Sequence, residues 1–160
     1  MVSVIDVAAY VLDLTGEVTA MKLQKLVYYS QAWSLVWDEE ELFPDVLQAW
    51  ANGPVAPALY QQHRGMFRVS RLGGSGDRLS AAQKDTIRRV VEFYGSRSAQ
   101  WLSDLSHLEF PWRCARARAK VASGEVCDEI ITTAEMHEYY SSLMPGDEQE
   151  TLTKRSTHRA

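Results

Sequence analysis

Cys114 is the side chain best suited to covalent chemistry, because Arg113 and Arg116 lie close to it in the sequence. Two guanidinium groups that converged on the thiol would lower its pKa and favour the nucleophilic thiolate. A cysteine nucleophile also needs a general base, and the sequence offers none in a recognisable pattern. We therefore predict no catalytic residue here, and an enzyme is not the expected class of protein.

The other residues that could hold a metal or a cofactor show no suitable spacing. The histidines are His63, His107, His137 and His158. None lies in an HExxH motif or at zinc-ligand spacing from a cysteine. Cys114 and Cys127 form no CxxC pair, and we expect them to be buried or half-buried thiols. The glycine-rich segment 73–77 lacks the GK[ST] ending of a phosphate-binding loop. No metal or cofactor is predicted.

A basic stripe is the next candidate, formed by Arg113, Arg116 and Lys120 at positions i, i+3 and i+7 of an expected helix. Such a stripe could hold phosphates, and a nucleic-acid-associated regulator that uses the basic segment 64–120 is the alternative function. A solvated helix face explains the same residues without a ligand. Because the net charge is −4 and no base-reading helix accompanies the stripe, we expect no specific nucleic-acid binding.

Charge is unevenly distributed along the chain. Residues 1–60 carry 2 Lys/Arg and 8 Asp/Glu, residues 61–120 carry 12 and 5, and residues 121–160 carry 3 and 8. Acidic and basic segments that fold against each other would explain this pattern. A basic face that meets an acidic partner or a nucleic acid is the other interpretation.

A protein-binding surface is the functional candidate in residues 38–60. Trp50 and Tyr60 belong to the residue types that dominate binding at interfaces, and the acidic run at Glu39, Glu40 and Glu41 would accelerate encounter with a basic partner. The same aromatics could instead anchor an extended element to the core. Both interpretations remain open at this point.

The elements that position these residues are mainly helical. Residues 20–37 form the clearest helix, capped by Thr19, with an apolar stripe and one wet flank that carries Lys22 and Lys25. Residues 42–51 are expected to be extended or hairpin-like, and the turn at 52–54 needs Gly53, which permits positive φ, before Pro54. A helix from Pro57 to His63 follows.

Capping signals place the remaining helices. We expect helices that begin after Ser3, Ser80, Ser98 and Thr133, a further helix that Pro111 opens, and extended segments at 66–72 and 126–131. The fold class is mainly α, a small α+β domain over residues 1–144. Residues 145–160 lack periodicity and are expected to be a disordered tail. No run of 18 apolar residues or signal segment is present, so we expect a cytoplasmic protein that does not enter membranes.

An ordered set of short motifs resembles one known family. The set comprises residues 22–29 (KLQKLVYY), Ala49-Trp50, Gly53-Pro54-Val55 with Tyr60, residues 93–95 (FYG), Leu102-Ser103, His107 and Pro111-Trp112. Together these motifs resemble the Panacea-domain family of SocA-like antitoxins, also known from GepA-type phage-associated proteins, over residues 1–143.

The resemblance implies a small helical antitoxin that holds a cognate toxin protein inactive, by direct binding or by delivery to a protease. It also implies packing roles for the motif residues. These are Leu23, Lys25, Leu26, Tyr28, Gly53, Pro54, Val55, Pro111 and Trp112. In particular, Trp112 is expected to be a packed core residue.

Overall fold

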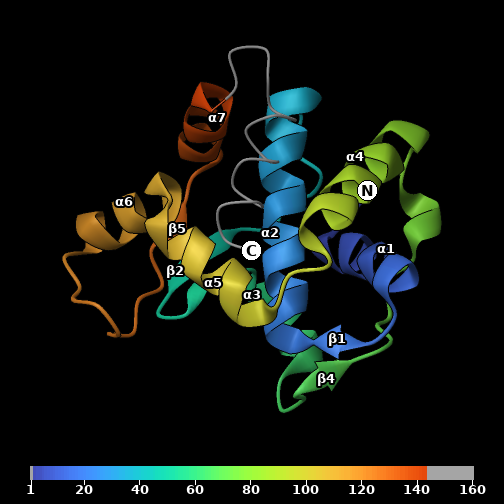
Figure 1. Cartoon of the computed structure of the whole chain (residues 1–160), viewed down its shortest axis with the longest axis horizontal. Coiled ribbons are helices and arrows are strands. Elements are labelled where there is room, and N and C mark those ends of the chain that lie inside the picture. The colour runs from blue at the N-terminus through green and yellow to red at the C-terminus, as the bar shows by residue number, and fades with distance from the viewer. Residues whose placement is uncertain (1, 144–160) are drawn as a thin grey trace.

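A computed structural model describes residues 2–143 of the chain. Its described helices are α1 (Val4–Thr15), α2 (Ala20–Trp37), α3 (Pro57–His63), α4 (Ala81–Tyr94), α5 (Ala99–Leu108), α6 (Phe110–Ala119) and α7 (Thr133–Ser142), with a 3₁₀ turn η1 (Gly76–Arg78). Figure 1 shows these helices gathered around α2. The prediction of a mainly α protein with some β structure is confirmed.

Within residues 2–143, five short strands form two small sheets. β1 (Val18–Thr19) pairs with β4 (Arg68–Val69), and a three-stranded sheet has the order β3 (Gly53–Val55), β2 (Leu47–Trp50), β5 (Ile130–Ile131). All pairings are antiparallel, with Trp50 opposite Gly53 at the closed end of the β2–β3 hairpin. Gly53 has φ = +119°, which explains why glycine stands at this turn. Strands in 66–72 and 126–131 are confirmed but are only two residues long.

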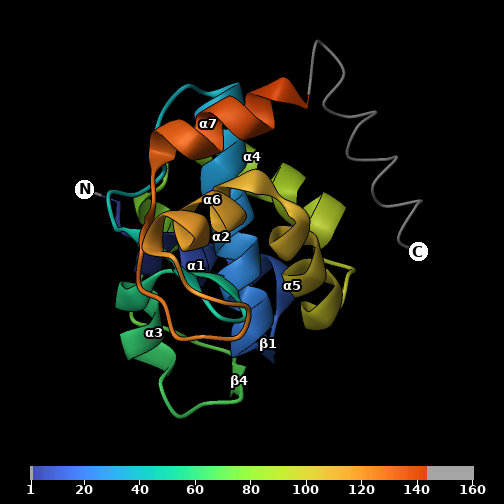
Figure 2. The same ribbon diagram turned by 90° about the vertical axis from the view of Figure 1, so that its left-hand side faces the viewer.

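Helix α2 is the central element of the fold. It packs against α1, α4, α5 and α7, and every residue from Leu23 to Leu35 is buried. The predicted bounds and the Thr19 cap are confirmed, since the Thr19 hydroxyl accepts from the Lys22 N–H. The predicted wet flank at Lys25 is wrong: the side chain of Lys25 is only 1% exposed. Helices from both ends of the chain enclose α2, so no flank of its middle turns reaches water. Figure 2 shows α7 crossing α2.

Local hydrogen bonds define most helix starts. Ser3 with Asp6 and Ser80 with Gln83 form capping boxes, and Ser98 caps α5. The last helix starts one residue earlier than predicted, because Thr132 and not Thr133 is its cap and forms a box with Glu135. The helix that Pro111 was expected to open starts at Phe110, with Pro111 in its first turn and Lys120 in left-handed conformation after its end.

Oppositely charged segments fold against each other. Arg68 pairs with Glu17 at 2.8 Å, and Arg118 pairs with Glu129 and with Glu135, each at 2.7 Å. These contacts join the basic middle of the chain to both acidic parts. They support the first interpretation of the uneven charge distribution.

A buried polar cluster ties α2 to the C-terminal helices. The carboxylate of Glu109, 1% exposed, accepts hydrogen bonds from the hydroxyls of Tyr29 at 2.6 Å and Tyr140 at 2.9 Å. Burial, followed by the charge of Glu109, raises the pKa of both phenols well above the ordinary value. The cluster joins α2 and α7 to the junction between α5 and α6 and stays closed to solvent, so it is a packing feature.

Candidate partner-binding pocket

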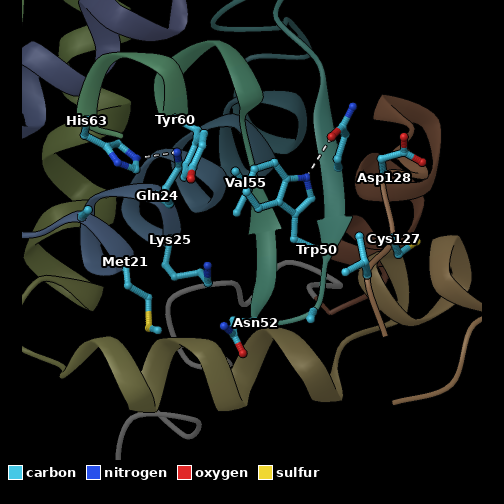
Figure 3. Close-up of a pocket in the computed structure, with 14 residues that line it drawn as sticks. Met21, Gln24, Lys25, Trp50, Asn52, Val55, Tyr60, His63, Cys127 and Asp128 are labelled. Atoms are coloured by element: carbon cyan, nitrogen blue, oxygen red, sulfur yellow. Dashed lines mark hydrogen bonds between the residues drawn. The ribbon is translucent and has the colours of Figure 1, made fainter. Parts of the chain in front are cut away.

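Trp50 and Tyr60, both expected in a binding surface, lie together in the structure. Their rings meet edge to face with centroids 5.0 Å apart, and both line a pocket of about 550 Å³ (Figure 3). Four parts of the chain form its walls: the first turns of α2, the β2–β3 hairpin, helix α3 and the loop before β5. Its lining residues are Ala20, Met21, Gln24, Lys25, Gln48, Trp50, Ala51, Asn52, Val55, Tyr60, His63, Val126, Cys127 and Asp128.

Gln24 fastens the hairpin end to α2. Its side-chain oxygen accepts from the Ala56 N–H at 2.9 Å, and its amide nitrogen donates to the Ala56 carbonyl at 3.3 Å. The same nitrogen lies 3.0 Å from His63 Nε2. Because a carboxamide nitrogen only donates, His63 accepts at Nε2, and burial lowers the pKa of His63. His63 is therefore a neutral acceptor in the pocket wall at neutral pH.

Lys25 is the buried cation of the pocket. Its Nζ donates to the Pro54 carbonyl at 3.2 Å, and burial lowers the pKa of the ammonium group to about 8. A Cβ atom on Gly53 would lie 2.6 Å from Lys25 Cε, so a side chain at position 53 would displace the end of Lys25 in addition to straining the positive φ. Lys25, Gly53 and Pro54, which the resemblance grouped as packing residues, are thus direct neighbours.

The acidic run does not border this pocket. The Glu40 carbonyl accepts from the Ser34 hydroxyl at 2.8 Å, which holds the exposed residues Glu39, Glu40 and Glu41 against the last turns of α2. Ser34 lies ten positions beyond Gln24, or about 15 Å along the helix axis at 1.5 Å per residue. Only a partner with an extended surface could contact both regions.

The predicted basic stripe is not formed on the surface. Arg113 and Lys120 are exposed, but Arg116 is 5% exposed. The Arg116 guanidinium donates to the carbonyls of Ala49, Ala122 and Glu125 at 2.8–2.9 Å. The Arg116 side chain lies against β2, so it supports the hairpin and cannot grip a phosphate. The nucleic-acid alternative therefore loses the residue in the middle of its predicted stripe.

Trp112 and Cys114 both form hydrogen bonds within the protein that are consistent with a structural role. Trp112 is 9% exposed and donates from Nε1 to the Trp50 carbonyl at 2.8 Å, as expected for a packed residue. The Cys114 thiol donates to Glu135 at 3.0 Å, and that hydrogen bond is the main reason why the pKa of Cys114 is raised. The expectation that arginines would lower this pKa if they converged is not met, because Glu135 holds the thiol in its protonated form.

The other motif residues are also buried. Leu23, Leu26 and Tyr28 are fully buried in α2, Val55 is 8% exposed and Pro111 is buried. Within residues 2–143, no group of three or more His, Cys, Asp or Glu side chains is arranged to hold a metal ion. The described helices also include none with the length and apolar character needed to cross a membrane.

Comparison with known protein families identifies the family of this chain. The model of the family described as "Antitoxin SocA-like, Panacea domain" matches residues 23–113, more than half of the chain. The chain belongs to this family. Comparisons with curated proteins and with solved structures found no match. The Panacea-domain match is shorter than the resemblance over residues 1–143 that the motifs suggested.

The Panacea-domain span contains most of the pocket. Gln24 and Lys25, the whole β2–β3 hairpin and helix α3 all lie inside residues 23–113. Val126, Cys127 and Asp128 close the pocket from outside that span. Sequence reasoning missed Gln24, His63 and Cys127 as pocket residues. The lysine in the apolar helix 20–37 was the one available signal, and it was interpreted as a solvated flank.

Proposed function

We propose that this Panacea-domain protein is an antitoxin that neutralises a cognate toxin protein by direct binding in the cytoplasm. Membership of the SocA-like antitoxin family is the observation that supports an antitoxin role. Neutralisation by direct binding depends on a surface that fits the toxin.

The pocket and its surroundings are the best candidate for that surface. Val126 at its edge is 93% exposed, and Phe67 nearby is 77% exposed. The Phe67 carbonyl accepts from the N–H of Ala20, a pocket residue, at 2.9 Å. Exposed apolar side chains around a hollow are typical of protein-binding sites, and aromatic residues such as Trp50 and Tyr60 supply much of the binding energy there. We call the set Trp50, Tyr60, Phe67 and Val126 the pocket face.

Two routes lead from binding to neutralisation. The antitoxin either masks the functional part of a folded toxin, or it delivers the toxin to a protease as an adaptor. Masking leaves a stable complex with an unchanged amount of toxin, whereas delivery lowers the amount of toxin over time. We favour masking, because it needs only the pocket face and no second binding surface.

The test is co-expression with the adjacent gene. The neighbour alone should arrest growth, and co-expression should restore it while the two proteins purify together in fixed proportion. A harmless neighbour, or rescue without a complex and with undiminished toxin, would contradict direct binding. A falling toxin level that depends on a cellular protease would instead favour the adaptor route.

Two phenylalanines provide a matched comparison for the location of the surface. Phe67→Asp changes the pocket face, and Phe110→Asp changes an exposed phenylalanine, 50% exposed, at the start of α6. Both side chains are at least half exposed, so neither change should unfold the protein. We expect Phe67→Asp to weaken neutralisation and Phe110→Asp to preserve it. The opposite result would move the surface to the α5–α6 side.

A further inference from the structure

Lys25 carries a buried positive charge that no described carboxylate neutralises. An ammonium group has three donors, and Lys25 uses one on the Pro54 carbonyl. Among residues 2–143, the Lys/Arg–Asp/Glu ion pairs involve other side chains. Asp128 lines the same pocket but forms no ion pair with Lys25. A buried charge without a counter-charge is costly, so a bound anion at this position would be favourable.

The other polar side chains deep in the pocket are already paired within the protein. Gln24 uses both ends of its amide on Ala56 and also meets His63. At the hairpin, Trp50 donates to Gln48 at 2.8 Å. The Lys25 ammonium group therefore has hydrogen-bond donors available for a ligand in the pocket interior. The ligand group that it favours is a carboxylate, because hydrogen bonds between ionised groups are stronger than those between neutral groups.

The rest of the pocket favours a ligand with an apolar group and an adjoining amide. Most of the lining surface is apolar, and 550 Å³ lies in the range of about 300–1,000 Å³ usual for small-ligand sites. Beside Lys25, the exposed side chain of Asn52 offers both a donor and an acceptor (Figure 3). A carboxylate, an apolar side chain and a neighbouring peptide group together make up the last residue of a polypeptide.

We propose that this pocket binds the carboxyl-terminal residue of a polypeptide, with its carboxylate on Lys25 and its apolar side chain against Trp50 and Tyr60. The assignment rests on the proposed function, since the toxin is the polypeptide that would present this chain end. Asn52 then binds the peptide group that precedes the terminal residue. A free organic acid could supply the carboxylate but not that peptide group.

The test is an NMR titration of the ¹⁵N-labelled full chain with three probes. They are the acetylated tripeptide Gly-Gly-Phe with a free carboxyl terminus, the same peptide as its carboxyl-terminal amide, and 3-phenylpropionate. The acid peptide should bind at least about tenfold more tightly than the amide, because only the acid completes a charge-assisted hydrogen bond to Lys25. Its binding should shift the amide signals of Asn52, Val55 and Val126.

Variants of two lysines on α2 provide the control. Lys25→Met keeps the length of the side chain and removes the charge, so it should bind the acid and the amide equally. Lys22→Met makes the same change outside the pocket lining and should retain the preference for the acid. If Lys25→Met does not fold, the comparison of acid with amide on the unaltered protein decides. Equal binding of both peptides there, or an acid preference that survives in Lys25→Met, would overturn the proposal.

The remaining outcomes separate the ligand from the function. Binding of 3-phenylpropionate as tight as that of the acid peptide would overturn the chain-end assignment and make the pocket a site for a small organic acid. A harmless neighbouring gene would contradict the antitoxin proposal but leave the peptide preference intact. Full neutralisation by Lys25→Met, in a protein that has lost the preference, would show that the toxin does not insert its chain end here.

Discussion

The charge state of Lys25 gives a stability prediction that can be worked from the structure. Burial lowers the pKa of this ammonium from 10.5 to about 8 in the folded protein. Between these two values, the unfolded chain binds the proton and the folded protein has released it. The free energy of unfolding should therefore rise with pH in this window. The ordinary case of a lysine with an acidic partner would give the opposite sign.

The magnitude follows from the size of the shift. At 1.36 kcal/mol per pKa unit, the buried charge costs about 3 kcal/mol at pH 7, where Lys25 is protonated in both states. As the pH rises from 7 to 9.5 and Lys25 in the folded protein loses its proton, the free energy of unfolding should increase by about 2 kcal/mol. His63 and His107 have lowered pKa values, so both histidines are neutral throughout this range and do not contribute.

The assay is urea denaturation, followed by circular dichroism, of the unaltered protein and Lys25→Met from pH 7 to pH 9.5. The difference between the two proteins is the quantity of interest, because effects of groups that do not interact with Lys25 cancel. The pKa values of Tyr28, Tyr29 and Tyr140 are well above the ordinary value. Ionisation of these residues in the unfolded chain therefore lowers stability above about pH 10 in both proteins alike.

The expected result is that the unaltered protein gains about 2 kcal/mol relative to Lys25→Met over this range. Lys22→Met is the control and should retain the gain. A constant difference between the unaltered protein and Lys25→Met would show that the Lys25 ammonium is hydrated or ion-paired in solution. That result would refute the reasoning about a buried charge and remove the basis for a carboxylate site.

Three further predictions concern packing and the partner. Trp112→Ala should lower the free energy of unfolding by about 3–5 kcal/mol in urea melts, because it removes a large buried side chain and its hydrogen bond to the Trp50 carbonyl. A loss below about 1 kcal/mol would mean that Trp112 is not packed. Reversing the charges of Glu39, Glu40 and Glu41 together should slow toxin association and weaken its salt dependence in stopped-flow measurements, with an unchanged melting temperature. Unchanged association rates would show that the acidic run plays no part in the encounter with the toxin. Tyr60→Ala should abolish neutralisation in the growth assay with little change in melting temperature, and Tyr60→Phe should preserve both. If Tyr60→Ala lowered the melting temperature and neutralisation together, Tyr60 would be a core residue.

Local signals in the sequence predicted much of the secondary structure. The cap at Thr19, the capping boxes at Ser3 and Ser80 and the cap at Ser98 depend on hydrogen bonds between residues three positions apart. Such bonds are visible in the sequence itself. The turn at Gly53-Pro54 was predicted for the same reason, because backbone restrictions of single residues define it. Adjacent polar residues can mislead by one position, as at Thr132 and Thr133.

The burial of α2 could not be predicted from its pattern. A lysine at position 25 is typical of a solvated flank, and the distinction between a surface helix and a central one depends on how many other helices pack around it. Here α1, α4, α5 and α7 surround α2. Packing of α6 against β2 turns Arg116 inward onto the Ala49 carbonyl, so the expected basic stripe never reaches the surface.

The sequence by itself determined the helices, the hairpin turn and the Panacea-domain family, because short-range hydrogen bonding, backbone restriction and ordered motifs are properties of neighbouring residues. The tertiary structure decided which of the candidate residues meet. It brought Trp50 and Tyr60 together, separated them from the acidic run, and placed Lys25 against Gly53 in a pocket whose walls come from residues 20 to 128. Contacts across such sequence distances arise from the packing of whole elements, and only the packed core shows that Lys25 is buried without an ion pair to any carboxylate in residues 2–143.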